Sequence, residues 1–130
     1  MKKTSANTWN LLLKKYKSDC QKIISLSKSI RYIGIINEHG RTLTGKINSG
    51  VKPLLSPNQV RSEFFAITTT TKLRERSLTA IGEFDHAILN HKKIIILLFQ
   101  NKKITYYITF GPKSSPSNQL IDKIKAVIEE

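Results

Sequence analysis

Short apolar runs separated by lysine-rich polar segments dominate the sequence, and the longest run covers residues 94–99. These six consecutive apolar residues, Ile94-Ile95-Ile96-Leu97-Leu98-Phe99, are typical of a strand that is buried on both faces. A strand of that kind needs helices on both sides of its sheet. This one segment therefore predicts a three-layer sandwich.

A long helix is predicted ahead of the strands, from about residue 8 to about residue 27. Its apolar residues recur at steps of three and four and fall within one third of the helix circumference. They are Trp9, Leu12, Leu13, Tyr16, Cys20, Ile23 and Ile24. The lysines of this segment spread over the remaining surface, which indicates a solvated outer face, with a phosphate-binding surface as the alternative.

Two strands are predicted next, at residues 30–37 and 41–48, joined by the turn Asn37-Glu38-His39-Gly40, in which Gly40 can take a positive φ. The first strand is apolar on both faces. We expect Ile30, Tyr32 and Ile36 on one face, with Ile33 and Ile35 on the other. The second strand alternates apolar and polar residues, which favours a sheet edge with one wet face.

The middle helix has the clearest start signal in the chain. Ser56 is an N-cap residue, Pro57 suits the first helical position, and Gln59 stands three residues after the cap, which together make a capping box. The run Thr68-Thr69-Thr70-Thr71 has poor helix propensity. We expect packing to carry the helix through it to about Arg76.

Three further strands are predicted at residues 83–90, 93–100 and 103–110, and a last helix follows Ser117. The residues of that helix expected to face inward are Leu120, Ile121, Ile124, Val127 and Ile128. The fold class is therefore α/β in the broad sense (α+β), a single domain over residues 1–130 with the order α-β-β-α-β-β-β-α. The first and fourth strands belong inside a five-stranded antiparallel sheet, and the second and third belong at its edges.

This order, with the strand-turn segment Ile33-Gly34-Ile35-Ile36-Asn37-Glu38-His39-Gly40, resembles the roadblock/dynein light chain family, which belongs with the longin- and profilin-like folds. The segments Glu63-Phe64-Phe65 and Ile81-Gly82-Glu83 also resemble small archaeal proteins of this class. The family implies non-enzymatic homodimers or heterodimers that regulate or scaffold small GTPases and motor complexes.

The resemblance also implies a pairing surface, formed by the middle helix and the third strand, that joins two sheets into one. Carried over to this chain, the surface consists of Val60, Phe64, Ile67 and Thr71 on the helix with Phe84, His86 and Ile88 on the strand. The family has no catalytic motif to transfer.

A net charge of +13 is the outlier in the composition and favours acidic partners. The candidate anion-binding residues are Lys92, Lys93, Lys102, Lys103, Arg74 and Arg76. The two lysine pairs flank the central strand at opposite ends of the sheet, and a dimer could merge them into a positive band. No aromatic residues interleave with them, so nucleic acid would bind mostly through phosphate electrostatics.

Catalytic chemistry finds no support in the sequence. No glycine-rich phosphate loop is present, and we expect neither a nucleotide cofactor nor a metal. His39, His86 and His91 are too scattered for a metal site, and Glu83 and Asp85 have no nucleophile nearby. Cys20 is expected to be a packed thiol.

Neither a secretory signal nor a membrane span is recognisable, so we expect a cytoplasmic protein. The preferred hypothesis is a regulatory or scaffolding module that homodimerises and docks on a protein partner, such as a small GTPase. The alternatives are a basic nucleic-acid-associated protein and, from the pockets of some profilin-like folds, a small-molecule sensor.

Overall fold

A computed structural model describes residues 5–130 of the chain. Its elements in chain order are α1 (Ser5–Ile24), β1 (Ile30–Ile36), β2 (Thr42–Ile47), α2 (Pro57–Arg74), the 3₁₀ turn η1 (Glu75–Ser77), α3 (Leu78–Ile81), β3 (His86–Asn90), β4 (Ile95–Asn101), β5 (Ile104–Phe110) and α4 (Asn118–Glu129). The predicted order of helices and strands is confirmed, and the short α3 is an addition to it.

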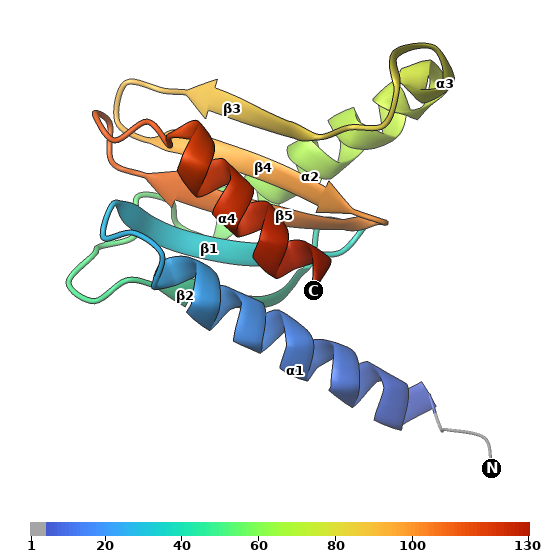
Figure 1. Cartoon of the computed structure of the whole chain (residues 1–130), viewed down its shortest axis with the longest axis horizontal. Helices are drawn as coiled ribbons and strands as arrows, with labels where there is room; N and C mark the ends of the chain where they lie inside the picture. The colour runs from blue at the N-terminus through green and yellow to red at the C-terminus, as the bar shows by residue number, and fades with distance from the viewer. Residues whose placement is uncertain (1–4) are drawn as a thin grey trace.

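The five strands form one antiparallel sheet in the order β2-β1-β5-β4-β3. Helices α1 and α4 cover the front of the sheet in the view of Figure 1, and α2 lies behind it. The three-layer arrangement is confirmed. The positions of the strands are confirmed as well, because β1 and β4 lie inside the sheet while β2 and β3 are its edges.

The apolar run at residues 94–99 lies in β4 from Ile95 onward, and both faces of this strand are buried. Ile95, Leu97 and Phe99 belong to the core beneath α1 and α4. Ile96 and Leu98 belong to a second core beneath α2. This strand therefore contributes to both cores at once. Each buried side chain of this size stabilises the fold by about 1.5–3 kcal/mol.

Strand β1 departs from the predicted assignment of faces at its first residue. Ile30 packs with Ile33 and Ile35 in the core beneath α1 and α4, whereas Tyr32 and Ile36 face α2. The register against β5 shifts between Ile30 and Tyr32, so one extra residue stands in β1 at that point. Such a bulge reverses the alternation of side chains, and the prediction for Ile30 is therefore wrong.

Helix α2 begins with the predicted capping box. The backbone N–H of Gln59 donates to Ser56 Oγ at 3.2 Å, and the Ser56 N–H donates to Gln59 Oε1 at 2.8 Å. The helix continues through the threonine run to Arg74 and passes directly into η1. Within the run, the Thr68 hydroxyl donates to the Phe64 carbonyl at 3.0 Å, which satisfies it inside the helix.

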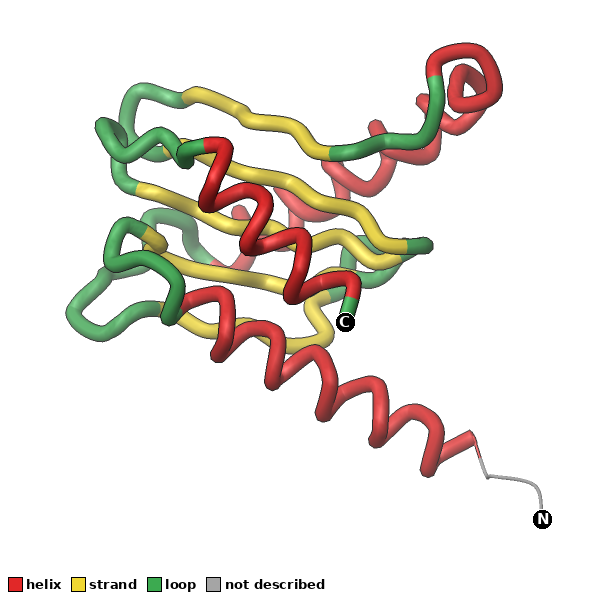
Figure 2. Tube along the Cα trace, viewed as in Figure 1, coloured by secondary structure: helices red, strands yellow, loops and turns green. Residues whose placement is uncertain are grey.

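Helix α1 extends beyond the sheet at its N-terminal end (Figures 1 and 2). A helix of 20 residues is about 30 Å long, while the six residues of β2 beside it span about 20 Å. Consequently Cys20 and Ile23 of the apolar stripe are buried, whereas Trp9 and Leu12 are exposed. Only the C-terminal half of the predicted stripe reaches the core.

The covered half of α1 carries a buried carboxylate. Asp19 accepts a hydrogen bond from the Tyr106 hydroxyl at 2.7 Å and pairs with Lys15 at 2.8 Å. The Tyr106 phenol therefore has a strongly raised pKa, first through burial and then through this carboxylate. Burial likewise raises the pKa of the neighbouring Cys20 thiol to about 11, with Asp19 adding to the effect. The interpretation of Cys20 as a packed thiol is confirmed.

Candidate functional site

An open groove of about 880 Å³ lies between the C-terminal half of α2, the short α3 and the sheet face next to β3. Its apolar lining comes from both sides of the groove: Ala66, Ile67, Leu78, Ile81, Phe84, Ala87, Leu89 and Leu98. The groove exists because α2 reaches past the sheet before the chain turns back at Gly82, where φ is +90°.

The side chains of β3 alternate between this groove and the opposite face of the sheet. Ala87 and Leu89 stand opposite β4 residues whose side chains belong to the core beneath α2, so they point toward the groove. His86 and Ile88 stand opposite Phe99 and Leu97, which face α4. The sequence-based surface combined His86 and Ile88 with α2; by register they stand on the other face of the sheet, although His86 also borders the groove.

The helix half of the predicted pairing surface is partly used inside the monomer. Phe64 is only 1% exposed and packs edge-on against Tyr107, with ring centroids 4.8 Å apart. Ile67 is also buried, and Val60 packs against the same core. Phe64 and Ile67 thus serve the monomer core, while Thr71 lines the groove.

Several large apolar residues of α2, α3 and β3 are exposed, and the sequence-based site did not include them. Phe65 is 63% exposed and Ile81 is 66% exposed, and Leu73 and Leu89 also reach solvent. The adjacent aromatic pair Phe64-Phe65 was the available signal, since one helix face cannot bury both rings. Which ring is buried depends on the rotation of α2 over the sheet.

The predicted basic residues are only partly brought together. Arg74, Lys102 and Lys103 line the groove, together with Glu38, Glu75, Glu83 and Asp85. Lys103 pairs with Glu38 at 3.4 Å. Lys92 and Lys93 lie in the turn before β4, at the other end of the strand as predicted, and Arg76 lies in η1 outside the groove. Cations and carboxylates alternate here, so this side of a single chain carries no uniform positive band.

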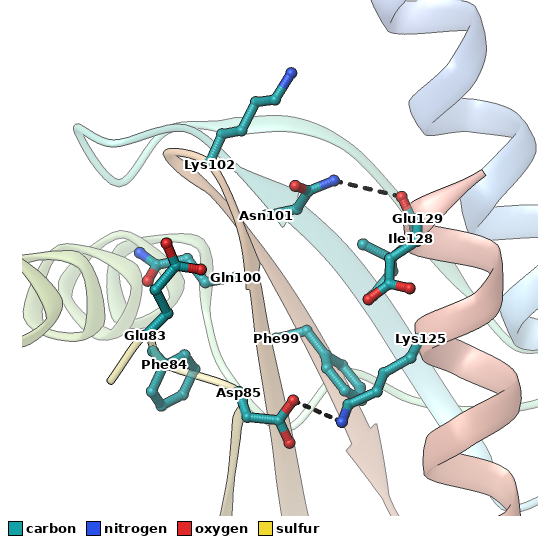
Figure 3. Close-up of a pocket in the computed structure, with 10 residues that line it drawn as sticks. All are labelled: Glu83, Phe84, Asp85, Phe99, Gln100, Asn101, Lys102, Lys125, Ile128 and Glu129. Carbon is teal, nitrogen blue, oxygen red and sulfur yellow. Dashed lines mark hydrogen bonds and ion pairs between the residues drawn. The ribbon is translucent and has the colours of Figure 1, made fainter. Parts of the chain in front are cut away.

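A smaller hollow of about 310 Å³ lies on the α4 side of the same sheet edge, and Figure 3 shows its lining. Lys125 of α4 pairs with Asp85 at 2.6 Å, and the other Asp85 oxygen bonds the His86 ring at 2.5 Å. These two partners lower the pKa of the Asp85 carboxyl, with the Lys125 hydrogen bond the largest cause. The Lys125 contact holds the loop before β3 against α4.

The carboxylates Glu83 and Asp85, which the predicted strand at residues 83–90 included, precede β3 instead of lying within it. Strand β3 starts at His86, so Glu83 and Asp85 belong to the connecting loop. Asp85 is engaged by Lys125, as described above. Within residues 5–130 no three His, Cys, Asp or Glu side chains gather as metal ligands would, and no helix there has the length and apolarity to cross a bilayer.

Comparisons with known proteins identify the architecture. No protein-family model matches the chain, and neither does any curated protein sequence. Solved structures do match. An MglB structure with a tetrameric arrangement superposes with a TM-score of 0.70 at 12% identity, covering 90% of this chain and 85% of that one.

Two further structures agree with that match. The MglB of Myxococcus xanthus superposes with a TM-score of 0.66 at 12% identity over 99% of this chain and 89% of that one. A Roadblock/LC7 domain from Streptomyces avermitilis gives 0.64 at 6% identity over 86% and 90%. The chain has the roadblock fold. The fold that the sequence resemblance implied is thereby confirmed, and in the roadblock fold of this chain the groove lies beside the free edge of β3.

Proposed function

We propose that this protein is a non-enzymatic interaction module that homodimerises through the β3 edge and the groove beside it. As a dimer it docks on a protein partner, and the roadblock resemblance points to a small GTPase. The observation that carries the proposal is the composition of β3. The strand His86–Asn90 lies at the edge of the sheet, yet it contains no lysine, arginine, aspartate or glutamate.

The other sheet edge provides the comparison. Edge strands normally carry charges that discourage pairing with another chain, and β2 has the exposed Lys46. Strand β3 instead exposes Ile88 on one face and Leu89 on the other. A second copy pairing antiparallel with β3 would satisfy its free backbone groups and cover both side chains.

The groove adds the apolar area that a short strand lacks. Stable interfaces bury about 1,200–2,000 Å² in total, more than five strand residues from each copy can supply. Ile81 and Leu89 line the groove on opposite sides, and in the monomer Ile81 is 66% exposed and Leu89 is 37% exposed. A two-fold arrangement would place the α2 end of each copy against the groove of its partner.

Analytical ultracentrifugation over a range of concentrations tests the dimer. We expect twice the mass of one chain at tens of micromolar, and a monomer for Leu89→Lys, because a charge would be buried at the new strand pair. The control Leu54→Lys adds the same charge at an exposed leucine in the loop between β2 and α2 and should remain dimeric. A monomeric wild-type protein, or equal behaviour of the two variants, would refute the proposal.

A binding assay with the purified dimer tests the proposed small-GTPase partner. Small GTPases from the source cell, loaded with GDP or with a non-hydrolysable GTP analogue, are immobilised and titrated with the protein. Binding that prefers one nucleotide state and is lost with Leu89→Lys supports the proposal. Retention on a mixed DNA and RNA pool at about 50 mM salt with a steep salt dependence, and no GTPase binding, would favour the nucleic-acid alternative instead.

A further inference from the structure

A second surface, separate from the groove, lies on the part of α1 that extends past the sheet. Its apolar stripe continues that of the buried half: Trp9, Leu12 and Leu13 stand at helical spacing ahead of Cys20 and Ile23. Cys20 and Ile23 pack against the sheet, whereas Trp9 and Leu12 are exposed. We name Trp9, Leu12 and Leu13 the α1 stripe.

The charges around the α1 stripe have a single sign. The first 18 residues of the sequence contain five lysines and no carboxylate, and the first acidic residue is Asp19. Lys17 is exposed and stands one turn after Leu13 on one side of the stripe, and the partly exposed Lys15 stands one turn after Leu12 on the other side. Toward the covered end of α1, Glu130 is already paired with Lys22 at 2.9 Å. The stripe is therefore an apolar strip bordered by cations.

The direction of the stripe limits the shape of its partner. The buried half of α1 packs against the sheet, and the helix continues past the end of the sheet in the same direction (Figure 1). The α1 stripe therefore lies on the same side of the helix as the sheet. A flat surface laid on the stripe would collide with the end of the sheet. A slender element such as a helix, about 10 Å across, fits this corner. A second copy of the same segment would bring lysines against lysines.

We propose that the α1 stripe is a docking site for an acidic amphipathic helix of a partner protein. Apolar residues of that helix would cover Trp9 and Leu12, and its carboxylates would meet Lys17. This mode extends the sheet-face core outward by about two helical turns, using residues that the core itself leaves exposed. It is independent of the dimer proposed above, which uses the opposite edge of the sheet.

Trp9 is the only tryptophan in the sequence, so its fluorescence reports on this site directly. The probe is a synthetic helical peptide of about 18 residues, without tryptophan or tyrosine, that carries leucines at steps of three and four between glutamates. We expect it to shift the Trp9 emission to the blue with saturation. A peptide with every glutamate replaced by lysine should leave the emission unchanged.

Two leucines provide matched variants that leave the reporter intact. Leu12 belongs to the stripe, whereas Leu11 is similarly exposed on the other side of the helix. We expect Leu12→Ser to weaken peptide binding about tenfold, through lost leucine burial, and Leu11→Ser to leave it within about twofold. Lys17→Glu should reduce the selectivity for the acidic peptide, whereas Lys14→Glu, beside Leu11 on the far side of the helix, should change it less.

Four outcomes would overturn the proposal. They are no emission shift with either peptide, equal shifts with both peptides, equal losses in Leu11→Ser and Leu12→Ser, or a blue shift with protein concentration alone, which would mean that a second copy covers the stripe. Vesicles of phosphatidylcholine with phosphatidylglycerol serve as the remaining arm. A shift with these vesicles and none with the acidic peptide would assign the stripe to a membrane surface and refute a helical partner.

Discussion

Phe64 and Phe65 provide the sharpest test of how α2 lies on the sheet, because they are adjacent residues of the same type in opposite environments. Phe64 is buried against Tyr107, whereas most of the Phe65 ring is in solvent. Replacing a buried phenylalanine by alanine costs about 3–5 kcal/mol, including the aromatic contact. The same replacement at an exposed position usually costs less than about 0.5 kcal/mol.

Urea unfolding followed by circular dichroism measures both costs. With an m value of about 2 kcal/mol/M, Phe64→Ala should lower the unfolding midpoint by about 2 M, and Phe65→Ala by less than about 0.3 M. The loss is a large share of a stability of about 5–15 kcal/mol. The comparison is made at several protein concentrations, because a dimer adds a concentration-dependent contribution to stability. Equal midpoint shifts, or a larger one for Phe65→Ala, would refute the described placement of α2.

Three further predictions concern individual polar groups. Tyr106→Phe removes one of two partners of the buried Asp19 carboxylate and should lower the free energy of unfolding by about 1–3 kcal/mol in the same urea assay, and no change would contradict the buried pair. The Asp85 carboxyl should titrate below its ordinary pKa by NMR, and Lys125→Gln should raise that pKa. Because the pKa is lower in the folded state than in the unfolded state, the Lys125–Asp85 contact stabilises the fold above the unfolded-state pKa, and this stabilisation is lost as the pH falls through the folded-state pKa. Cys20 should resist a thiol reagent at pH 8 in the folded protein and react once urea unfolds it, and rapid labelling without urea would show that the thiol is not packed.

Much of the fold could be predicted because its signals are local. The run at residues 94–99 needs only its own composition to indicate burial on both faces, and the structure places it inside the sheet. The capping box at Ser56 and Gln59 is a contact between residues three apart, so it forms whatever the helix packs against. Both elements were predicted for the same reason: neighbours in sequence provide most of the relevant contacts.

The face on which a strand residue lies was harder to predict, because it depends on a partner distant in sequence. Ile30 changes face because β1 has a bulge opposite β5. His86 and Ile88 face away from α2 because their register with β4 sets the alternation. A shift of one residue in such a register exchanges every side chain between the two faces. Hydrophobicity alone does not contain that register.

The sequence by itself determined the layers, the order of the elements and which strands are central, since apolar periodicity and capping are properties of short segments. Only the tertiary structure decided which apolar residues are left over. Phe64 is buried and Phe65 is not because of how α2 is rotated on the sheet. Trp9 is exposed because α1 is longer than the sheet it covers. Both proposed surfaces include apolar residues that the core leaves exposed. Which residues these are depends on the packing of the whole chain.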